Sequence, residues 1–157
     1  LDFTRRCIKR LGRHFERGGA FLLDAGSGAI PHDELLGYGE KFERRVCVDL
    51  SPQALRVAKR KLGDKGVCIQ GDLTNLPIES NTMDAVTCNH VIYLIPEEKQ
   101  KDAFLEVWRV LKPGGVAVVV YWWPYEPLTV RLQRWAERFI ERGAAAEALA
   151  DQPTMYH

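Results

Sequence analysis

Two glycines and a downstream acid are spaced along this sequence as in sites that bind a ribose-containing ligand. The stretch LLDAGSGAI, residues 22–30, runs from apolar residues into Asp24, and Gly26 and Gly28 follow. Glycines adopt positive φ and leave no Cβ between the backbone and a ligand. Asp49 comes 21 residues after Gly28. At that spacing an acid at the end of a second strand accepts hydrogen bonds from two ribose hydroxyls.

A second acid and its neighbour suit the base of such a ligand. Asp72 can accept a hydrogen bond from an exocyclic amine such as that of adenine, and the backbone amide of Leu73 can donate to a ring nitrogen. A dinucleotide fingerprint needs a third glycine beside the pyrophosphate, and Pro31 stands at that position. The pattern therefore favours a ligand that contains adenine and ribose but no pyrophosphate.

Each of these features also has a structural interpretation. The two glycines can merely connect a strand to a helix, Asp49 can help to cap the helix that follows it, and Asp72 can be a solvated loop acid. His90 has two interpretations as well. Its imidazole can deprotonate a nucleophile near neutral pH, or it can simply pack or hydrogen-bond beside the ligand.

The composition excludes several classes of protein. The 157 residues carry a formal net charge of +1, so no overall field attracts nucleic acid or an anionic membrane. The longest apolar run, residues 116–123, is far shorter than a bilayer requires. The four cysteines form no CxxC pair, which indicates reduced core residues of a cytoplasmic protein and no metal site. We therefore expect one domain, residues 1–157, with neither a nucleic-acid nor a membrane partner.

The elements that position the candidate residues alternate between short apolar runs and amphipathic stretches. This pattern is typical of a parallel sheet with helices on both faces. Strands are predicted at residues 20–24, 45–49, 66–70, 83–89 and 116–121. Helices are predicted at residues 3–15, 33–42, 52–62, 97–111 and 128–140. Because ligands bind an open parallel sheet outside the carboxyl ends of its strands, the candidate residues after these strands are expected to share one rim.

Two of these elements give more detailed expectations. The helix at 97–111 is expected to bury one side, formed by Phe104, Val107, Trp108 and Leu111. The KPGG stretch, residues 112–115, is expected to turn the chain into the last strand. That strand is almost continuously β-branched, as in a strand that is buried on both faces.

Four stretches resemble the successive motifs of class I S-adenosylmethionine-dependent methyltransferases. They are LLDAGSGAI, VCVDLSPQAL, CIQGDLTNLPIESNTMDAVTCNHVIYLI and EVWRVLKPGGVAVVVYW, within residues 21–122. The resemblance implies a doubly wound, mostly parallel Rossmann-like α/β sheet, in the order 3-2-1-4-5 with helices on both faces. It also implies that S-adenosylmethionine is the cofactor and S-adenosylhomocysteine the product.

The same resemblance assigns the cofactor site residue by residue. The residues that it implies are Asp24, Gly26, Ser27, Gly28, Asp49, Leu50, Asp72, Leu73 and Asn89. The first four surround the methionine part, and Asn89 faces it from the end of the fourth strand. Asp49 binds the ribose hydroxyls and Leu50 flanks the adenine. Asp72 and Leu73 bind the adenine edge.

The acceptor side is less specific. His90 stands where small-molecule members of the family line the active site, and it is the candidate catalytic residue. Acceptor-pocket candidates, which can equally be core residues, are His32, Tyr93, Trp122, Trp123 and Tyr125. The family often has glycine where Ile30 stands. A branched side chain there is expected to narrow the methionine pocket or to shift the turn.

By resemblance, the reaction is an in-line displacement of a methyl group from a sulfonium. The fourth strand is not followed by the Asn/Asp-Pro-Pro-aromatic tetrapeptide of enzymes that methylate nucleic-acid amines or protein amides. With the small net charge, this favours a small-molecule acceptor. Two alternatives remain: a catalytically inactive module with the methyltransferase fold, used for binding or as a structural part, and a nicotinamide-dependent oxidoreductase. Pro31 and Asp72 count against the second.

Class I methyltransferases usually end with an antiparallel hairpin that covers the outer edge of the fifth strand. No segment after Ile140 has strand character here. A bare strand edge pairs readily with another chain. We therefore expect a domain truncated at its C-terminus, with the missing segment or a partner chain in a homo-oligomer covering this edge.

Overall fold

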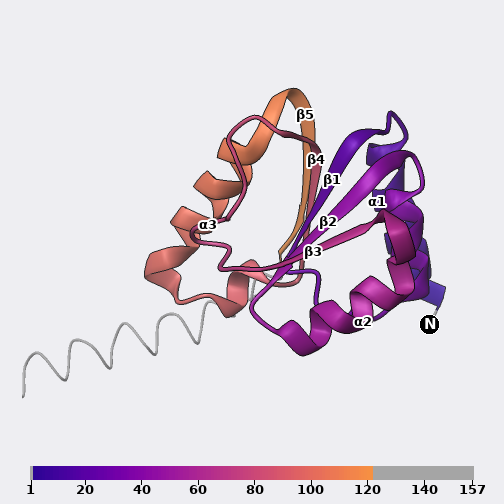
Figure 1. Ribbon diagram of the computed structural model, residues 1–157, viewed down its shortest axis with the longest axis horizontal. Helices are drawn as coiled ribbons and strands as arrows, with labels where there is room; N and C mark the ends of the chain where they lie inside the picture. The colour runs from indigo at the N-terminus through magenta and orange to yellow at the C-terminus, as the bar shows by residue number, and fades with distance from the viewer. Residues whose placement is uncertain (1, 122–157) are drawn as a thin grey trace, which may run out of the picture. The chain divides into compact units, whose positions relative to one another are not determined.

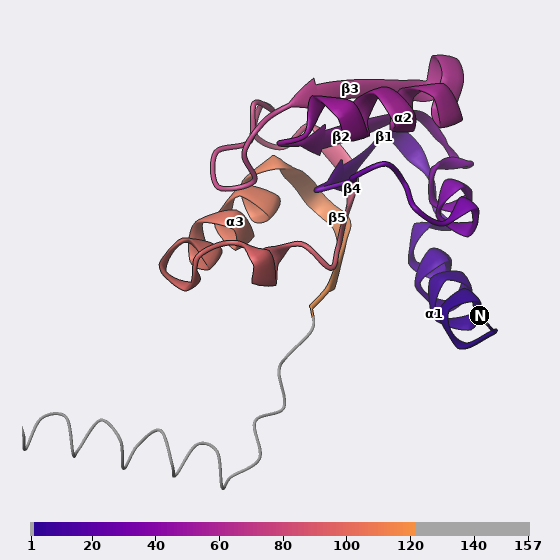
Figure 2. The same cartoon turned by 90° about the horizontal axis from the view of Figure 1, so that it is seen from below.

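The structure, a computed structural model, describes residues 2–121 (Figure 1). They belong to the first of two units of the chain, Leu1–Trp122 and Trp123–His157. Within the described residues, parallel strands form one sheet in the order β3-β2-β1-β4-β5, which confirms the predicted order (Figure 2). The strands are β1 Gly19–Ala25, β2 Phe42–Asp49, β3 Gly66–Gln70, β4 Met83–Asn89 and β5 Leu111–Val120.

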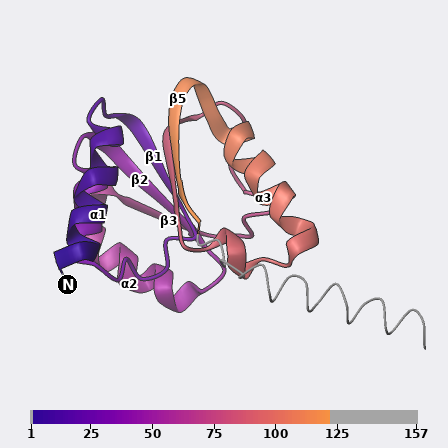
Figure 3. The same ribbon diagram turned by 180° about the vertical axis from the view of Figure 1, so that it is seen from behind.

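Helices cover both faces of the sheet, as predicted. The helices α1 (Asp2–Gly12) and α2 (Pro52–Leu62) lie on one face, and α3 (Glu97–Val110) lies on the other (Figures 1 and 3). Successive residues of a strand point to opposite faces. Leu23 accordingly packs in the cluster that contains the α3 side chains, and Leu22 packs in the cluster that contains those of α1.

The helix α2 begins and ends where the sequence predicts. The Oγ of Ser51 accepts a hydrogen bond from the backbone N–H of Ala54 at 3.2 Å, and Pro52 is the first helical residue. Gly63 follows the helix with φ 56°, a conformation that ends helices and favours glycine. The N-terminus of α2 is thereby held directly after Asp49 at the end of β2.

The segment at residues 33–42 forms a shorter element than the predicted helix. It is a 3-10 helix, η2 (Asp33–Gly39), and Phe42 already belongs to β2. Glycines inside the segment weaken an α-helix. Gly39 also lies against Arg45, because a Cβ at this glycine would be 3.2 Å from the Cδ of the arginine. The short η2 therefore packs closely against β2.

The KPGG stretch at residues 112–115 lies inside β5 and not before it. Leu111 pairs with Met83. Val116, five residues later in β5, pairs with a residue only two positions after Met83 in β4. The extra residues of β5 form a bulge, and Gly114 within it has φ 76°. Proline and glycine are typical of both turns and bulges, so the sequence pattern alone did not separate the two.

The prediction that β5 is buried on both faces is wrong. In the described sheet β5 is an outer strand that pairs with β4. Val118 is buried, whereas Val116 is 37% exposed. An outer strand has a sheet neighbour on one side only, so a continuous β-branched run does not by itself indicate burial.

The predicted buried side of α3 is partly wrong. Trp108 is 77% exposed and Phe104 is 43% exposed. The buried residues of α3 are Ala103, Val107 and Val110. They follow helical spacing, one residue away from the predicted stripe, and the small Ala103 allows the helix to approach the sheet closely. Leu111, the last predicted residue, is buried but belongs to β5.

Some predictions fall outside the described residues. They are the acceptor-pocket candidates Trp122, Trp123 and Tyr125 and the helix at 128–140. The single domain over residues 1–157, and the covering of the β5 edge by a missing C-terminal segment or a partner chain, stay predictions. Within residues 2–121, no helix is long and apolar enough to cross a membrane.

Candidate functional site

The turn after β1 has the backbone conformation that the two glycines predict. Gly26 has φ 71° and Gly28 has φ 52°. A Cβ on Gly26 would lie 2.6 Å from the Cγ2 of Val91, so this glycine is needed for the turn to pack against the segment after β4. A Cβ on Gly28 would meet no atom within 4 Å. Gly28 therefore borders open space, in which a ligand can approach the backbone.

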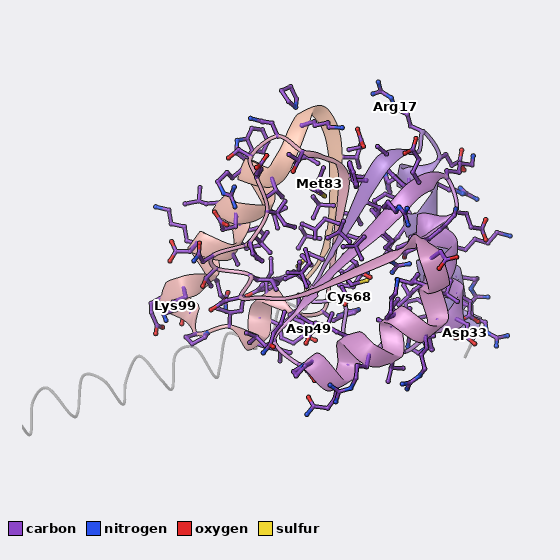
Figure 4. The ribbon with its side chains drawn as sticks, viewed as in Figure 1. Arg17, Asp33, Asp49, Cys68, Met83 and Lys99 are labelled. Atoms are coloured by element: carbon purple, nitrogen blue, oxygen red, sulfur yellow. The ribbon has the colours of Figure 1, made fainter. Side chains whose placement is uncertain are left out.

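Asp49 connects this turn to the end of β2. Its Oδ2 accepts a hydrogen bond from the N–H of Gly28 at 2.8 Å, and its Oδ1 accepts one from the N–H of Ser51 at 2.9 Å. Figure 4 shows Asp49 at the lower end of the sheet, where the strands converge. A carboxylate can accept about four hydrogen bonds, so these two bonds leave acceptor positions for ribose hydroxyls. The capping interpretation is only partly right, since Ser51 is the N-cap residue of α2.

The end of β3 joins the same rim. The N–H of Gly71 donates to the backbone oxygen of Asp49 at 3.1 Å. Asp72 is exposed, and its Oδ1 accepts a hydrogen bond from the N–H of Thr74 at 2.8 Å. Hydrogen bonds from Thr74 lower the pKa of the Asp72 carboxyl, which keeps it charged. The side chain of Leu73 is buried in the core, so only its backbone can serve the predicted role.

An apolar side chain and an unpaired oxygen complete the rim. Leu50 is 67% exposed beside Asp49, as expected of a residue that flanks an adenine. At the end of β4, the Nδ2 of Asn89 donates to the Oγ1 of Thr87 at 2.9 Å. The Oδ1 of Asn89 is buried, and in the described part of the chain it has no hydrogen-bond partner. A buried acceptor of this kind favours a ligand that brings an N–H donor.

Below the glycine turn, Asp24 forms a buried ion pair with Arg45 of β2. The Oδ2 of Asp24 accepts hydrogen bonds from the Nε of Arg45 at 3.2 Å and from its Nη2 at 2.5 Å. Asp24 is 4% exposed and Arg45 is 1% exposed. Burial raises the pKa of the Asp24 carboxyl, and the guanidinium opposes that rise. Arg45 was missed from the sequence, although a charged residue before the apolar run VCV of a central strand was a usable signal.

Ile30 does not line an open pocket. It is fully buried and packs with Cys47, Leu55 and Ala58, beneath α2. Its φ is 51°, a left-handed conformation that is rare for a β-branched residue. The expected narrowing of the methionine pocket is therefore not found. The expectation that Ile30 shifts the turn stays a prediction.

Aromatic side chains lie near the ends of β4 and β5. His90 is exposed, its backbone N–H donates to the oxygen of Val120 at 2.9 Å, and its ring lies 6.3 Å from that of Tyr93. The rings of Tyr93 and Tyr121 are 5.9 Å apart and nearly perpendicular. Tyr121 was missed as a site residue, although it directly follows β5 and so lies at the same rim. His32 is exposed just before η2.

The described residues contain no group of three or more His, Cys, Asp or Glu side chains that could hold a metal ion. A hollow of about 400 Å³ lies at the opposite, amino ends of the strands, and its lining includes Gly19, Asp84 and Lys112. Ligands of open parallel sheets bind at the carboxyl ends. We therefore assign the candidate site to the rim formed by the ends of β1, β2, β3 and β4.

A family model described as a methyltransferase domain matches residues 23–119, from β1 to β5. The chain belongs to the methyltransferase domain family. The recognition of a class I S-adenosylmethionine-dependent methyltransferase is thereby confirmed, and with it S-adenosylmethionine as the cofactor of the family.

Three similar proteins illustrate the relationship. A demethylmenaquinone methyltransferase from Renibacterium salmoninarum is 37% identical over 101 residues, which are 64% of this chain and 40% of that protein. One from Thermobifida fusca is 31% identical over an alignment of 157 positions, which covers 92% of this chain and 65% of that protein. The structure of an amino pentose methyltransferase from Micromonospora echinaspora with bound S-adenosylmethionine has a TM-score of 0.61 and 26% identity, over 80% of this chain and 52% of that one. The chain thus spans between 40% and 65% of the length of these relatives.

Proposed function

We propose that this domain binds S-adenosylmethionine at the carboxyl rim of the sheet and transfers its methyl group to a small-molecule acceptor. The observation that supports the site best is the contact between Asp49 and the N–H of Gly28 at 2.8 Å. It places an acid with spare acceptor capacity directly beside the open space at Gly28. An adenosine ligand needs both features together.

The residues of the rim fit the parts of this cofactor. Asp49 accepts hydrogen bonds from the ribose hydroxyls, Leu50 covers the adenine, and Asp72 accepts from its exocyclic amine. The unpaired Oδ1 of Asn89 accepts from the ammonium of the methionine part. When bound, the cofactor supplies a methyl group that is already activated on a sulfonium.

The chain itself then has to position the acceptor and keep water away. Positioning of this kind supplies about 7–11 kcal/mol of a barrier. The aromatic rings of His90, Tyr93 and Tyr121 form a wall on which a flat or cyclic acceptor can pack. A base is needed only where the acceptor must lose a proton, and the exposed imidazole of His90 is the candidate for that role. The names of the relatives, which act on demethylmenaquinone and on an amino pentose, support a small-molecule acceptor.

Formation of S-adenosylhomocysteine in the presence of a panel of quinol and amino-sugar acceptors tests this activity. We expect product with at least one acceptor, and none with the Asp49→Ala variant. Cofactor binding without transfer to any acceptor would contradict the activity and favour the alternative of an inactive binding module. Binding of NADH in place of either sulfur compound would favour the oxidoreductase alternative.

A further inference from the structure

We propose that Arg45 is a positioning residue that favours the charged form of Asp24 and anchors residues 24–35, which contain the glycine turn, at both ends. The inference rests on the proposed function only where it concerns the cofactor. The charge state of Asp24 can be tested without any ligand.

The register of the sheet explains how Arg45 reaches Asp24. Arg45 pairs with Leu22, and Asp24 pairs with Cys47, two residues further along each strand. Because the side chains of residues two apart share a face of the sheet, the long side chain of Arg45 runs along this face toward the carboxyl end. There its Nε and Nη2 both donate to the Oδ2 of Asp24.

The same guanidinium also holds η2. Its Nη1 donates to the backbone oxygen of Leu35 at 2.6 Å. Residues 24–35 contain the glycine turn and Ile30, so one arginine side chain binds this segment at its first and last residues. Ile30 inside the segment has the left-handed φ of 51°. An anchor at both ends holds such a conformation in place, and the turn is then ordered before the cofactor arrives.

The surroundings of Asp24 give Arg45 its electrostatic role. Described groups whose charges interact with Asp24 are Tyr38 of η2, Arg45, Cys47 and Asp49 of β2, and Cys88 of β4. Of these five side chains, Arg45 alone is a cation, and Asp49 raises the pKa of Asp24 further. A buried carboxylate without a partner takes up a proton instead of remaining charged. Without Arg45, the pKa of Asp24 is therefore expected to rise further.

The Arg45→Met variant tests this expectation by the pH dependence of unfolding without ligand. In this variant burial raises the pKa of Asp24 without the opposing guanidinium, so the stability is present at low pH and is lost as the pH rises toward the folded-state pKa. Between the unfolded-state pKa and the raised folded-state pKa of Asp24, the unfolding equilibrium constant should rise about tenfold per pH unit, because unfolding then releases one proton, and this range should extend to higher pH in the variant than in the wild type. The Asp24→Asn, Arg45→Met double variant should lack this slope.

Cofactor affinity gives the second measurement. We expect Arg45→Met to bind S-adenosylhomocysteine roughly tenfold more weakly at a pH where the variant is folded, because the glycine turn is then no longer held in its binding conformation. A tenfold change in affinity corresponds to about 1.4 kcal/mol. Arg45→Lys, which keeps a positive charge, should show a proton-linked slope over no wider a pH range than the wild type. The matched control is Arg44→Met, since Arg44 is exposed and its guanidinium donates to the backbone oxygen of Asp64. This control should behave as the wild type does.

Three results would overturn the proposal. One is a proton-linked slope for Arg45→Met that is absent or extends to no higher pH than that of the wild type, and another is a loss of affinity no larger than that of Arg44→Met. If Arg45→Met does not fold, a proton-linked slope in Arg45→Lys that extends to higher pH than that of the wild type would equally contradict the charge role. A wild-type chain that binds neither S-adenosylmethionine nor S-adenosylhomocysteine would refute the proposed function instead, and the slope would still decide the role of Arg45.

Discussion

Gly28→Ala is the substitution that separates cofactor binding from folding most cleanly. The Cβ of the new alanine would meet no protein atom within 4 Å, so the folded chain has room for it. It would, however, occupy the space in which the ligand is expected to approach the backbone. The matched control is Gly114→Ala in the bulge of β5, where φ is also positive, at 76°, and a Cβ would again meet no atom within 4 Å.

The magnitudes follow from these two environments. A left-handed conformation costs an alanine about 1–2 kcal/mol, so both variants should lose a similar amount of unfolding free energy. A methyl group forced against a closely packed partner costs about 1–3 kcal/mol more, and only Gly28→Ala is expected to incur this cost when ligand binds. Because 1.4 kcal/mol corresponds to a tenfold change in affinity, this cost predicts that S-adenosylhomocysteine binds Gly28→Ala roughly 5- to 150-fold more weakly.

Chemical denaturation measures the unfolding free energies of Gly28→Ala and Gly114→Ala, and calorimetric titration measures their affinities for S-adenosylhomocysteine. The predicted result is equal destabilisation and a loss of affinity in Gly28→Ala alone. If Gly28→Ala bound the compound as tightly as Gly114→Ala does, the open space beside Gly28 would not be the cofactor site.

Asp49→Ala should weaken cofactor binding more than it weakens the fold. The lost ribose bonds to a charged group are worth about 1.5–3 kcal/mol each, whereas the partly buried N–H groups of Gly28 and Ser51 can bind water in place of the carboxylate. Ser51→Ala, which removes only the helix cap, is the control, and equal affinity losses in the two variants would refute the role of Asp49. Ile30→Gly should relieve about 1–2 kcal/mol of backbone strain but lose about 2–5 kcal/mol of core packing. Denaturation should therefore show a net loss of stability, and a variant more stable than the wild type would contradict the assigned packing.

Local signals allowed much of the sheet and of its rim to be predicted. The strands at 66–70 and 83–89 match residue for residue, because each is a short apolar run bounded by turn residues. The positive φ of Gly26 and Gly28 and the cap at Ser51 likewise depend on residue types that have few other uses. These features are decided within a few residues of the chain.

What could not be predicted depends on contacts between distant segments. The pairing of Arg45 with Asp24 joins two strands, and neither strand indicates the partner that the other offers. The bulge at residues 112–115 is defined by its register against β4, and the sequence of β5 alone does not contain that register. The exposure of Trp108 likewise depends on which side of α3 meets the sheet.

Calorimetric titration of the wild-type chain with S-adenosylmethionine, S-adenosylhomocysteine and NADH tests the central claim most directly. Both sulfur compounds are predicted to bind at one site, each stabilising the fold by about 2.7 kcal/mol at a concentration 100 times its dissociation constant. NADH is predicted to give no binding heat. Binding of NADH together with no binding of either sulfur compound would contradict the assignment of the rim between Gly28 and Asp49 to an S-adenosylmethionine site.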